Sequence, residues 1–485
     1  MKCDIIVVGS GNAALSAALS ARERGAKVLV IEKAPHVGGD SRCSDGALRF
    51  TYENPDEIFE LVSNVTREEL ETIVLSPFRY TKGDYYREWM DITQGYANSE
   101  LVEVVVNNSW ETIRWLRNHG VEYELYTDGG VRIGNKLYLI PGLPMRARGG
   151  GEGLVNYEMK EAEKMGVKIM CNTKATKLIV DGRGTVVGVK VLKKEGYSEI
   201  YSNAVILACG GFQANVEMRT RYLGSAWTIA KVRGSRYNTG DGLKMAFEIG
   251  AQAVGHYSGC HSPLIDANAP DFESKMEGAR HFYHLGIIID ERGKRFVDEG
   301  EDFVPKVYAK LGEIVKKHLS GIAYQVFDSK VAHFLPPTYE KYGSLVHANS
   351  VKGIAEELGI DPKSLEKTIS EFNKAVKTGN FNLCALDGKG TDGVDPPKSN
   401  WALPLDTPPF IACPVVGGIT FTFGGVRINR HAQVLNDENE VIKGLYACGE
   451  IVGGLFYYNY LGGSGLVAGA TFGRISGINA VAEGT

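Results

Sequence analysis

The chain has 485 residues, of which 44 % are hydrophobic and 23 % charged, and its formal net charge is −4. The length predicts more than one domain, and the small net charge without a long basic run gives no electrostatic reason to expect nucleic acid or an anionic membrane as a partner. No stretch reaches the roughly 18 apolar residues of a membrane span, and the N-terminus enters a strand without a leader pattern, so we expect a cytoplasmic protein.

The first predicted elements form a strand–turn–helix–strand unit. A strand over residues 4–8 leads into a glycine turn and a helix, and a second strand over residues 27–31 finishes at Glu32. The turn has the GxGxxA form of the dinucleotide fingerprint. Gly9 permits the tight turn, Gly11 lets the backbone approach a pyrophosphate at the helix N-terminus, and the carboxylate can accept ribose hydroxyls. We therefore predict dinucleotide binding.

Motifs further along the chain indicate FAD rather than NAD. A β-meander is predicted around residues 168–191, and the resemblance of the late motifs to those of FAD proteins implies that a last helix points its N-terminus at the pyrimidine edge of the flavin. None of the eight cysteines forms a CxxC pair, which argues against a metal, an iron–sulfur cluster or an attached haem. The motifs that resemble segments of FAD proteins are Gly38-Gly39-Asp40-Ser41, Ala208-Cys209-Gly210-Gly211-Phe212, Thr239-Gly240-Asp241-Gly242, Gly444-Leu445-Tyr446-Ala447-Cys448-Gly449-Glu450 and Gly462-Gly463-Ser464-Gly465-Leu466.

Together these motifs resemble the fumarate reductase and succinate dehydrogenase flavoprotein superfamily. The resemblance implies an α/β fold, in which a Rossmann-like FAD-binding domain of the glutathione-reductase type is interrupted by an α+β capping domain. We place the FAD-binding domain at residues 1–258 and 416–485 and the capping domain at residues 259–415. The residues expected to bind FAD are Gly9, Gly11, Asn12, Ala13, Ala14, Glu32, Lys33, Gly38, Gly39, Asp40, Ser41, Ala175, Gly210, Asp241, Gly449, Glu450, Gly465 and Leu466.

The capping segment departs from the pattern of the fumarate reductases. Phe303 stands where their proton-donating arginine is expected, Phe421 where a substrate histidine is expected, and Tyr460 where a late substrate arginine is expected. A dianionic substrate requires cations that bind it in a bidentate way. We therefore expect fumarate to be a poor substrate.

The departures resemble the FAD-dependent tricarballylate dehydrogenase branch of the superfamily. This resemblance implies an oxidoreductase that acts on a CH–CH or C=C bond next to a carboxylate or carbonyl and exchanges a hydride with flavin N5. A 3-ketosteroid-type dehydrogenase is an alternative, because the step from Tyr460 to Gly462 is similar to a segment of those enzymes. A non-catalytic flavin electron-relay protein is an alternative from a different class.

Such chemistry needs a residue that transfers a proton and a residue that polarises the substrate. Tyr308, His261 and His284 are candidates for the proton transfer, although a structural hydrogen-bonding role is the simpler interpretation of each. Arg280 is a candidate for holding a substrate carboxylate, as is Arg146, for which a solvated loop charge is the simpler interpretation.

Tyr460 is the candidate polariser of the substrate, because its sequence position places it directly before the glycine turn that opens the last helix. Tyr457 and Tyr458 make an aromatic cluster with it, in which one or two rings can simply pack.

FAD is expected to be bound non-covalently, because Asp40 stands where covalent relatives place a histidine and His36 is out of register with that position. The sequence contains no NAD(P)H-binding domain and no metal or haem motif. The partners that we expect are a small-molecule carboxylate or carbonyl substrate and a separate electron acceptor or donor, which can be a partner protein, a quinone or a soluble carrier.

Overall fold

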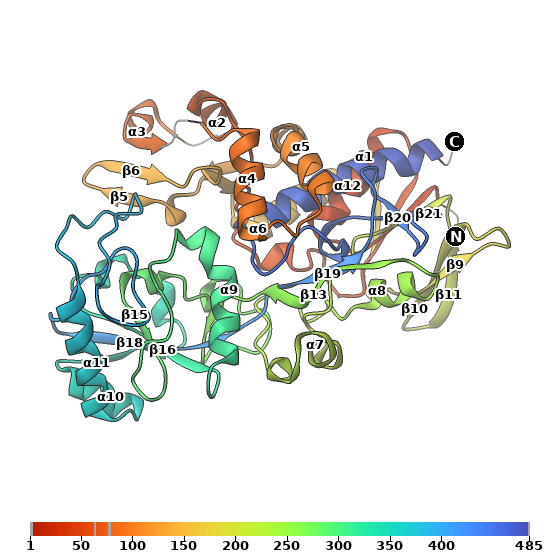
Figure 1. Ribbon diagram of the computed structural model, residues 1–485. Helices are drawn as coiled ribbons and strands as arrows, with labels where there is room; N and C mark the ends of the chain where they lie inside the picture. Colours follow the sequence, from red (N-terminus) through yellow and green to blue (C-terminus); the bar gives the residue numbers. More distant parts are fainter. Residues whose placement is uncertain (1–2, 63–64, 76–78, 484–485) are drawn as a thin grey trace. The chain divides into compact units, whose positions relative to one another are not determined.

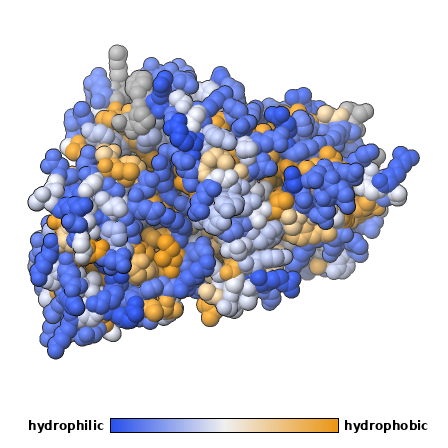
Figure 2. Space-filling model, viewed as in Figure 1, coloured by the Kyte–Doolittle hydropathy of each residue, from blue (hydrophilic) through white to orange (hydrophobic). Residues whose placement is uncertain are grey.

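The computed structural model describes residues 3–62, 65–75 and 79–483, and the chain divides into two compact units. The first unit holds Met1–Thr228, Gly234–Cys260 and Phe421–Thr485, and the second holds Ile229–Arg233 and His261–Thr420. The predicted capping segment, residues 259–415, corresponds to most of the second unit. No helix in the described ranges is both long and apolar enough to cross a bilayer. The face drawn in Figure 2 is mostly hydrophilic.

The first unit is built on a six-stranded sheet with the strand order β20-β21-β12-β1-β2-β8. Its strands β20 and β21 are labelled in Figure 1. All neighbouring strands are parallel except β20 and β21. All four residues of β1 and all four residues of β2 are isoleucine, valine or leucine and are buried, as parallel strands between helix layers require. The strands are β1 (Ile5–Val8), β2 (Val28–Ile31), β8 (Lys168–Met170), β12 (Ala204–Leu207), β20 (Gln433–Leu435) and β21 (Val441–Ala447).

Two helices from opposite ends of the sequence pack closely against one another in this unit. Helix α1 spans Asn12–Glu23 and helix α12 spans Ser464–Glu483. A Cβ atom added at Gly473 of α12 would lie 2.5 Å from the carbonyl oxygen of Ala13, and one added at Gly477 would lie 2.5 Å from that of Ala17. The glycines at this four-residue spacing therefore allow the two backbones to approach more closely than side chains would permit.

The remaining elements of the first unit lie around this sheet. β9 and β10 and then β10 and β11 pair antiparallel, which confirms the predicted meander, but its first predicted residues form β8 in the parallel sheet instead. The other elements are α2 (Pro55–Leu61), α3 (Arg67–Leu70), β3 (Ile73–Leu75), α4 (Lys82–Ile92), α5 (Ser99–Asn118), β4 (Tyr123–Leu125), β5 (Val131–Ile133), β6 (Lys136–Leu139), β7 (Met145–Ala147), α6 (Gly150–Lys164), β9 (Lys174–Val180), β10 (Val186–Lys193), β11 (Gly196–Tyr201), α7 (Val216–Leu223), α8 (Asp241–Phe247), β13 (Ala253–His261) and β19 (Phe421–Val426).

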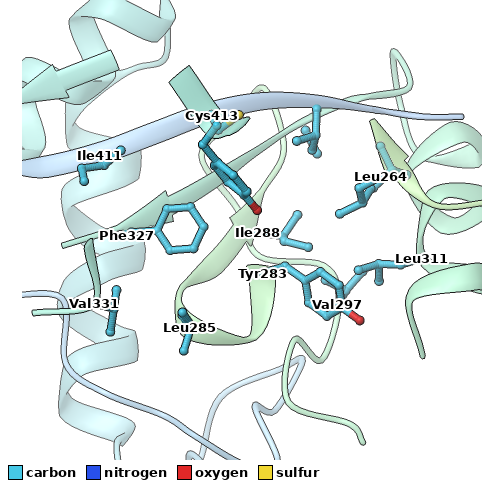
Figure 3. Packing of buried hydrophobic residues seen from close by; sticks show 14 residues of the cluster. Leu264, Tyr283, Leu285, Ile288, Val297, Leu311, Phe327, Val331, Ile411 and Cys413 are labelled. Carbon is cyan, nitrogen blue, oxygen red and sulfur yellow. The ribbon is translucent and has the colours of Figure 1, made fainter. Parts of the chain in front are cut away.

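The second unit is an antiparallel sheet with helices, which agrees with the expected α+β capping domain. Its strand order is β14-β18-β16-β15, and β17 pairs with β18. Figure 3 shows the core, in which side chains from the strands, from the segment before β15 and from α9 pack together. The elements are β14 (Leu264–Asp266), β15 (Ile287–Ile289), α9 (Val304–Lys317), β16 (Ile322–Phe327), β17 (Val346–Ala348), α10 (Val351–Leu358), α11 (Pro362–Ala375) and β18 (Phe410–Gly417).

Candidate functional site

The glycine turn between β1 and α1 has the geometry of a phosphate-binding turn. Gly9 has φ +105°, and a Cβ atom there would lie 2.3 Å from the carbonyl oxygen of Ala208. Gly11 is the N-cap of α1, so no side chain of its own accepts from the first-turn N–H groups. A Cβ atom at Gly11 would crowd the Ser41 hydroxyl oxygen at 3.2 Å. The backbone therefore approaches closely on both sides, and the positive end of α1 can face a ligand phosphate.

Glu32 ends β2 as the fingerprint predicts, and only 7 % of its surface is exposed. Its carboxylate accepts from the Ser10 hydroxyl at 2.6 Å and from the Ala34 backbone N–H at 2.7 Å. These two contacts fix the carboxylate beside the glycine turn. The second lone pair of each oxygen can still accept from a ribose hydroxyl.

The Gly38–Ser41 segment lies directly against the start of α1. The Gly38 N–H donates to the Ser10 hydroxyl oxygen at 3.1 Å, and the Asn12 N–H donates to the Ser41 hydroxyl oxygen at 3.1 Å. Gly38 and Gly39 both adopt positive φ, +128° and +49°, which glycine tolerates without strain. Two segments that are expected separately to bind FAD are thus joined by hydrogen bonds.

Lys33 and Asp241, both expected to bind FAD, form an ion pair with one another. Lys33 Nζ lies 2.6 Å from an Asp241 carboxylate oxygen, and Lys174 Nζ lies 2.8 Å from the other. Burial raises the pKa of the Asp241 carboxyl, but hydrogen bonds and charges from the two lysines outweigh burial and lower this pKa to about 2. The predicted Ala175 follows Lys174 on β9 and is buried. These side chains hold α8, β9 and the end of β2 together at one end of the site.

Asp40 and Glu450 belong to a partly buried polar cluster bridged by an amide that the sequence does not single out. The Gln213 Nε2 group donates to Asp40 and, at 3.2 Å, to Glu450. Glu450 also accepts from Asn238 Nδ2 at 3.3 Å and from the Thr422 backbone N–H at 2.9 Å. Burial, and next the charge of Asp40, raise the pKa of Glu450 above its usual range. The predicted glycines frame this cluster, since a Cβ atom at Gly210 would lie 2.5 Å from Asn238 Nδ2.

The N-terminus of α12 meets the N-terminus of α1 at Asn12. The Asn12 Nδ2 group donates to the Leu466 carbonyl oxygen at 2.8 Å. The predicted Gly449 also faces this point, because a Cβ atom there would lie 2.8 Å from the Ala13 side chain. The Gly465 N–H donates to the Tyr460 hydroxyl oxygen at 3.0 Å, and a hydroxyl that accepts one hydrogen bond can also donate one. The candidate polariser therefore lies at the first turn of α12.

The residues of the first unit fit FAD. Among the residues that the structure describes, the buried Asn12 Oδ1 and Gln213 Oε1 atoms have no hydrogen-bond partner. Buried polar atoms are rarely left without a partner, so these two mark places for ligand groups. One lies between two positive helix ends, where a pyrophosphate is stabilised, and the other lies in a polar cluster that can bond ligand hydroxyls. The Glu32 end is suited to the ADP half, which leaves the α12 end to the flavin half.

In the second unit, two imidazoles contact the predicted Tyr308 in the first turns of α9. The Tyr308 ring lies 4.9 Å from the His261 ring and 4.8 Å from the His281 ring, with steep angles of 90° and 66° between the planes. Burial, and next the charge of Arg233, lower the pKa of His261 well below its usual range and lower the pKa of His281 to about 3. Both imidazoles are therefore neutral at pH 7. His281 is not identifiable from the sequence, where its one mark is its place directly after Arg280.

The other two candidates of the second unit, Arg280 and His284, have partners of their own. Arg280 forms a fully buried ion pair with Asp266, at 2.5 Å between Nη2 and Oδ2. His284 packs against Trp401 with 5.7 Å between ring centroids, and burial lowers its pKa to about 3. Its backbone carbonyl accepts from the buried Lys398 Nζ at 2.8 Å. Arg146 lies on strand β7 of the first unit rather than in a solvated loop, and its partly buried side chain pairs with Glu124 and Asp128 at 2.7 Å each.

The substituted positions carry aromatic packing. Phe303 is the N-cap residue of α9, and its ring lies 5.7 Å from that of Trp401. Phe421, at the start of β19, contacts Tyr460 in the first unit with 5.1 Å between ring centroids.

Comparisons with known proteins agree with this geometry. The model of the FAD binding domain family matches residues 4–466. The chain is similar to the NADH:acrylate oxidoreductase of Vibrio harveyi, with 27 % identity over 532 residues that cover 98 % of this chain and 50 % of that protein. It is similar to the fumarate reductase (cytochrome) of Shewanella frigidimarina, with 30 % identity over 482 residues, 98 % of this chain and 76 % of that protein. The chain thus spans half the length of the first relative.

A solved structure has the same fold. The open conformation of a flavocytochrome c3 fumarate reductase superposes with a TM-score of 0.75 and 26 % sequence identity, covering 100 % of this chain and 78 % of that one.

Proposed function

The chain belongs to the FAD binding domain family and to the fumarate reductase and succinate dehydrogenase flavoprotein superfamily of FAD-dependent oxidoreductases, and from this premise we propose that it acts on a carbon–carbon bond next to a carboxylate or carbonyl in a substrate other than fumarate. A tricarballylate dehydrogenase-like activity is the form that the sequence resemblance favours. In either direction the bound FAD supplies the two-electron chemistry by exchanging a hydride with the substrate.

The observation that carries this proposal is the contact between Phe421 and Tyr460. The two positions that fumarate-reducing relatives are expected to fill with a histidine and an arginine here hold rings in edge-to-face contact. Neither ring can form a bidentate bond to a second carboxylate. The pair instead offers apolar surface and one hydroxyl donor, which suits a substrate with a single carboxylate or carbonyl at this position.

Tyr460 is suited to polarise that group. Its hydroxyl oxygen already accepts the Gly465 N–H, and this bond makes the phenolic O–H a better donor. A fixed neutral donor stabilises enolate-like charge as it develops on the substrate. The exchange of a proton at the neighbouring carbon requires a second group.

Tyr308 is the group that we propose for the proton exchange. The rings of His261 and His281 both contact its ring, and both imidazoles are neutral at pH 7. A neutral imidazole can accept a hydrogen bond from a phenol or donate one to it, depending on its tautomer. We propose that, once substrate binds, one of these imidazoles takes the proton of the Tyr308 hydroxyl or returns it. His261 is the second candidate, whereas His284 packs against Trp401 instead.

We also propose that electrons enter or leave through a separate partner. Within the described residues no group of three or more histidine, cysteine, aspartate or glutamate side chains is placed to hold a metal ion. A separate protein, a quinone or a soluble carrier can take this part.

An anaerobic screen of flavin absorbance tests the proposal. The purified protein is mixed with tricarballylate, with saturated and unsaturated monocarboxylates, with 3-ketosteroids and with succinate, and bleaching near the flavin absorbance maximum is recorded. The reduced protein is mixed in parallel with the unsaturated partners and with fumarate. We expect a carboxylate other than succinate to bleach the flavin. Bleaching by a steroid alone would establish the ketosteroid alternative, and no response to any compound would support an electron-relay protein.

A further inference from the structure

Arg49 is a buried arginine that contacts the glycine turn immediately before α12. Only 1 % of its surface is exposed. Its Nε donates to the Gly462 carbonyl oxygen at 2.7 Å, and its backbone N–H donates to the Gly463 carbonyl oxygen at 3.1 Å. A Cβ atom at Gly463 would lie 3.0 Å from the Arg49 backbone nitrogen. One residue thus fixes both carbonyls of the turn, and only glycine permits the approach.

These contacts set the direction of the peptide group between the two glycines. In a trans peptide the C=O and the following N–H point in opposite directions. Because the Gly462 carbonyl points to Arg49, the Gly463 N–H points away from it. The Ser464 N–H closes the turn by donating to the Leu461 carbonyl oxygen at 3.1 Å. The Gly463 N–H is therefore directed outward, beside the first N–H groups of α12.

The charge of Arg49 lies near the N-terminus of α12, which is the positive end of the dipole of that helix. The Nη1 group donates to the Tyr80 hydroxyl oxygen at 3.2 Å and to a Glu88 carboxylate oxygen at 3.3 Å. Glu88 is the more exposed partner of this pair, with side-chain exposures of 2 % for Arg49 and 25 % for Glu88. Solvent screens the carboxylate more than the guanidinium, so the turn experiences a net positive potential.

A second observation indicates a place for a ligand group beside the first turn of α12, which follows this turn. Asn12 Oδ1 is buried and has no partner among the described residues, while Asn12 Nδ2 bonds to Leu466 in the first turn of α12. Glu32, the ribose-side carboxylate, lies at the end of β2 beside the start of α1. A dinucleotide whose pyrophosphate occupies the start of α1 has its ADP half toward Glu32, so its flavin half extends toward α12.

We propose that Arg49 is a positioning residue that raises the reduction potential of bound FAD, by holding the Gly462–Gly463 turn and adding positive potential at the flavin. Negative charge develops on a flavin ring that has taken up a hydride, and a cation and oriented N–H groups stabilise it. This role goes beyond the proposed function and holds whichever substrate is used.

Sulfite binding tests the proposal without any substrate. Sulfite forms an S–N bond with N5 of oxidised flavin, and its electron pair leaves the ring anionic, so its affinity reports positive potential around the ring. The experiment uses the FAD-loaded protein, titrated with sodium sulfite, and measures the midpoint potential by dye equilibration. We expect Arg49→Met to weaken sulfite binding at least tenfold and to lower the midpoint potential by about 30 mV for each tenfold change, as a two-electron couple requires. Arg49→Lys keeps the charge but not the fork of donors, and an intermediate loss is expected.

Two further variants keep the test decisive if Arg49→Met does not retain FAD. Glu88→Gln removes the compensating charge with little change of shape, and a tighter sulfite complex is expected. Arg474→Met removes a cation from the same helix ten residues further on, about 15 Å along its axis, and is the matched control that should leave sulfite affinity within twofold of the parent. Unchanged sulfite affinity and potential in Arg49→Lys and Glu88→Gln would overturn the proposal, as would an effect of Arg474→Met equal to theirs.

Discussion

The rings of Phe421 and Tyr460 meet edge to face, with 5.1 Å between their centroids and 87° between their planes. Phe456 completes the group, because its ring lies 5.7 Å from Phe421 and 5.1 Å from Tyr460. Edge-to-face aromatic packing of this kind stabilises a site by about 0.5–1.5 kcal/mol per pair beyond area burial. The two substituted positions therefore support one another, and replacing Tyr460 alone with arginine would remove two of these aromatic contacts.

This relationship predicts that fumarate reoxidises the reduced protein slowly. Each charge-assisted hydrogen bond that is missing removes about 1.5–3 kcal/mol of binding, or one to two orders of magnitude in affinity. Stopped-flow absorbance of the photoreduced protein with fumarate and with acrylate would compare a dianion with a monoanion. Phe303→Arg alone should not restore fumarate turnover, because Tyr460 still offers no cation. Fast reoxidation of the parent protein by fumarate would show that the three positions are not the ones that hold the substrate.

Tyr460→Phe should slow flavin reduction by the true substrate by about 10²–10³, the usual effect of losing one preorganised donor. The sequence alone predicts unchanged stability for this variant. The structure predicts a small loss, about 1 kcal/mol, because the Gly465 N–H loses its acceptor. Rapid-reaction kinetics and thermal unfolding measure the two effects. Tyr458→Phe is the matched control, because Tyr458 is 38 % exposed. An equal rate in both variants would leave Tyr460 with a packing role only.

The flavin should be released intact by acid precipitation. Asp40 accepts a hydrogen bond from Gln213 Nε2 and another, at 2.5 Å, from the Ser235 backbone N–H. Its carboxylate therefore serves as a hydrogen-bond acceptor in the site and not as the point of covalent attachment of the flavin. Absorbance of the supernatant and of the washed pellet after trichloroacetic acid measures the partition, and one FAD per chain is expected in the supernatant. A yellow pellet would mean a covalent bond and direct attention to His36, whose ring lies 6.1 Å from that of Tyr237.

Glu158 should make the protein less stable as the pH rises. This side chain on α6 is fully buried, accepts from the Ser16 hydroxyl at 2.8 Å, and has one oxygen without a partner among the described residues. Burial raises its pKa well above the usual value, so above about pH 4 the folded state holds a proton that the unfolded state has lost. The free energy of unfolding therefore falls by about 1.4 kcal/mol for each unit by which the pH rises, until the pH passes the pKa of Glu158 in the folded state.

Glu158→Gln tests this sign, because its side chain is neutral at every pH. The stability of the variant relative to the parent should grow between pH 5 and pH 9 in urea denaturation, while Glu163→Gln, at an exposed position of the same helix, should show no such trend. A pH-independent difference would mean that the carboxyl is ionised in the folded protein.

The parallel core of the fold could be predicted because the sequence patterns that indicate it, short apolar runs and a glycine turn, each lie within a few consecutive residues. β12 occupies Ala204–Leu207 as predicted, and the ends of β1, α1 and β2 differ from the prediction by one residue. Pairing between distant segments could not be predicted. Residues 229–233 belong to the second unit because the Val232 N–H bonds to Asp271 at 2.7 Å and the Arg233 N–H bonds to Ile419 at 2.9 Å. A segment of five residues is too short to show a hydrophobic periodicity, and nothing in it indicates which distant residues it will pair with.

The same contrast holds for the candidate site. Its glycines could be recognised because a close backbone approach restricts the residue type at fixed spacing. Arg49, Gln213 and His281 could not, since each is defined by partners brought near by folding rather than by its neighbours in sequence. Arg280 shows the converse, because a conspicuous arginine in a motif-like stretch is used for a buried ion pair with Asp266.

The close packing of α1 on α12 also bears on the order in which the protein is made. Asn12 and the Leu466 carbonyl that it contacts are 454 positions apart in the chain. At the usual 5–20 residues per second, a ribosome needs roughly 20–90 s to get from one to the other. Throughout that interval the face of α1 with Ala13 and Ala17 is not covered by Gly473 and Gly477 of α12. The part of the cofactor site that α12 provides is also missing. Nascent chains that stop short of α12 should therefore remain colourless and be targets for chaperones and proteases.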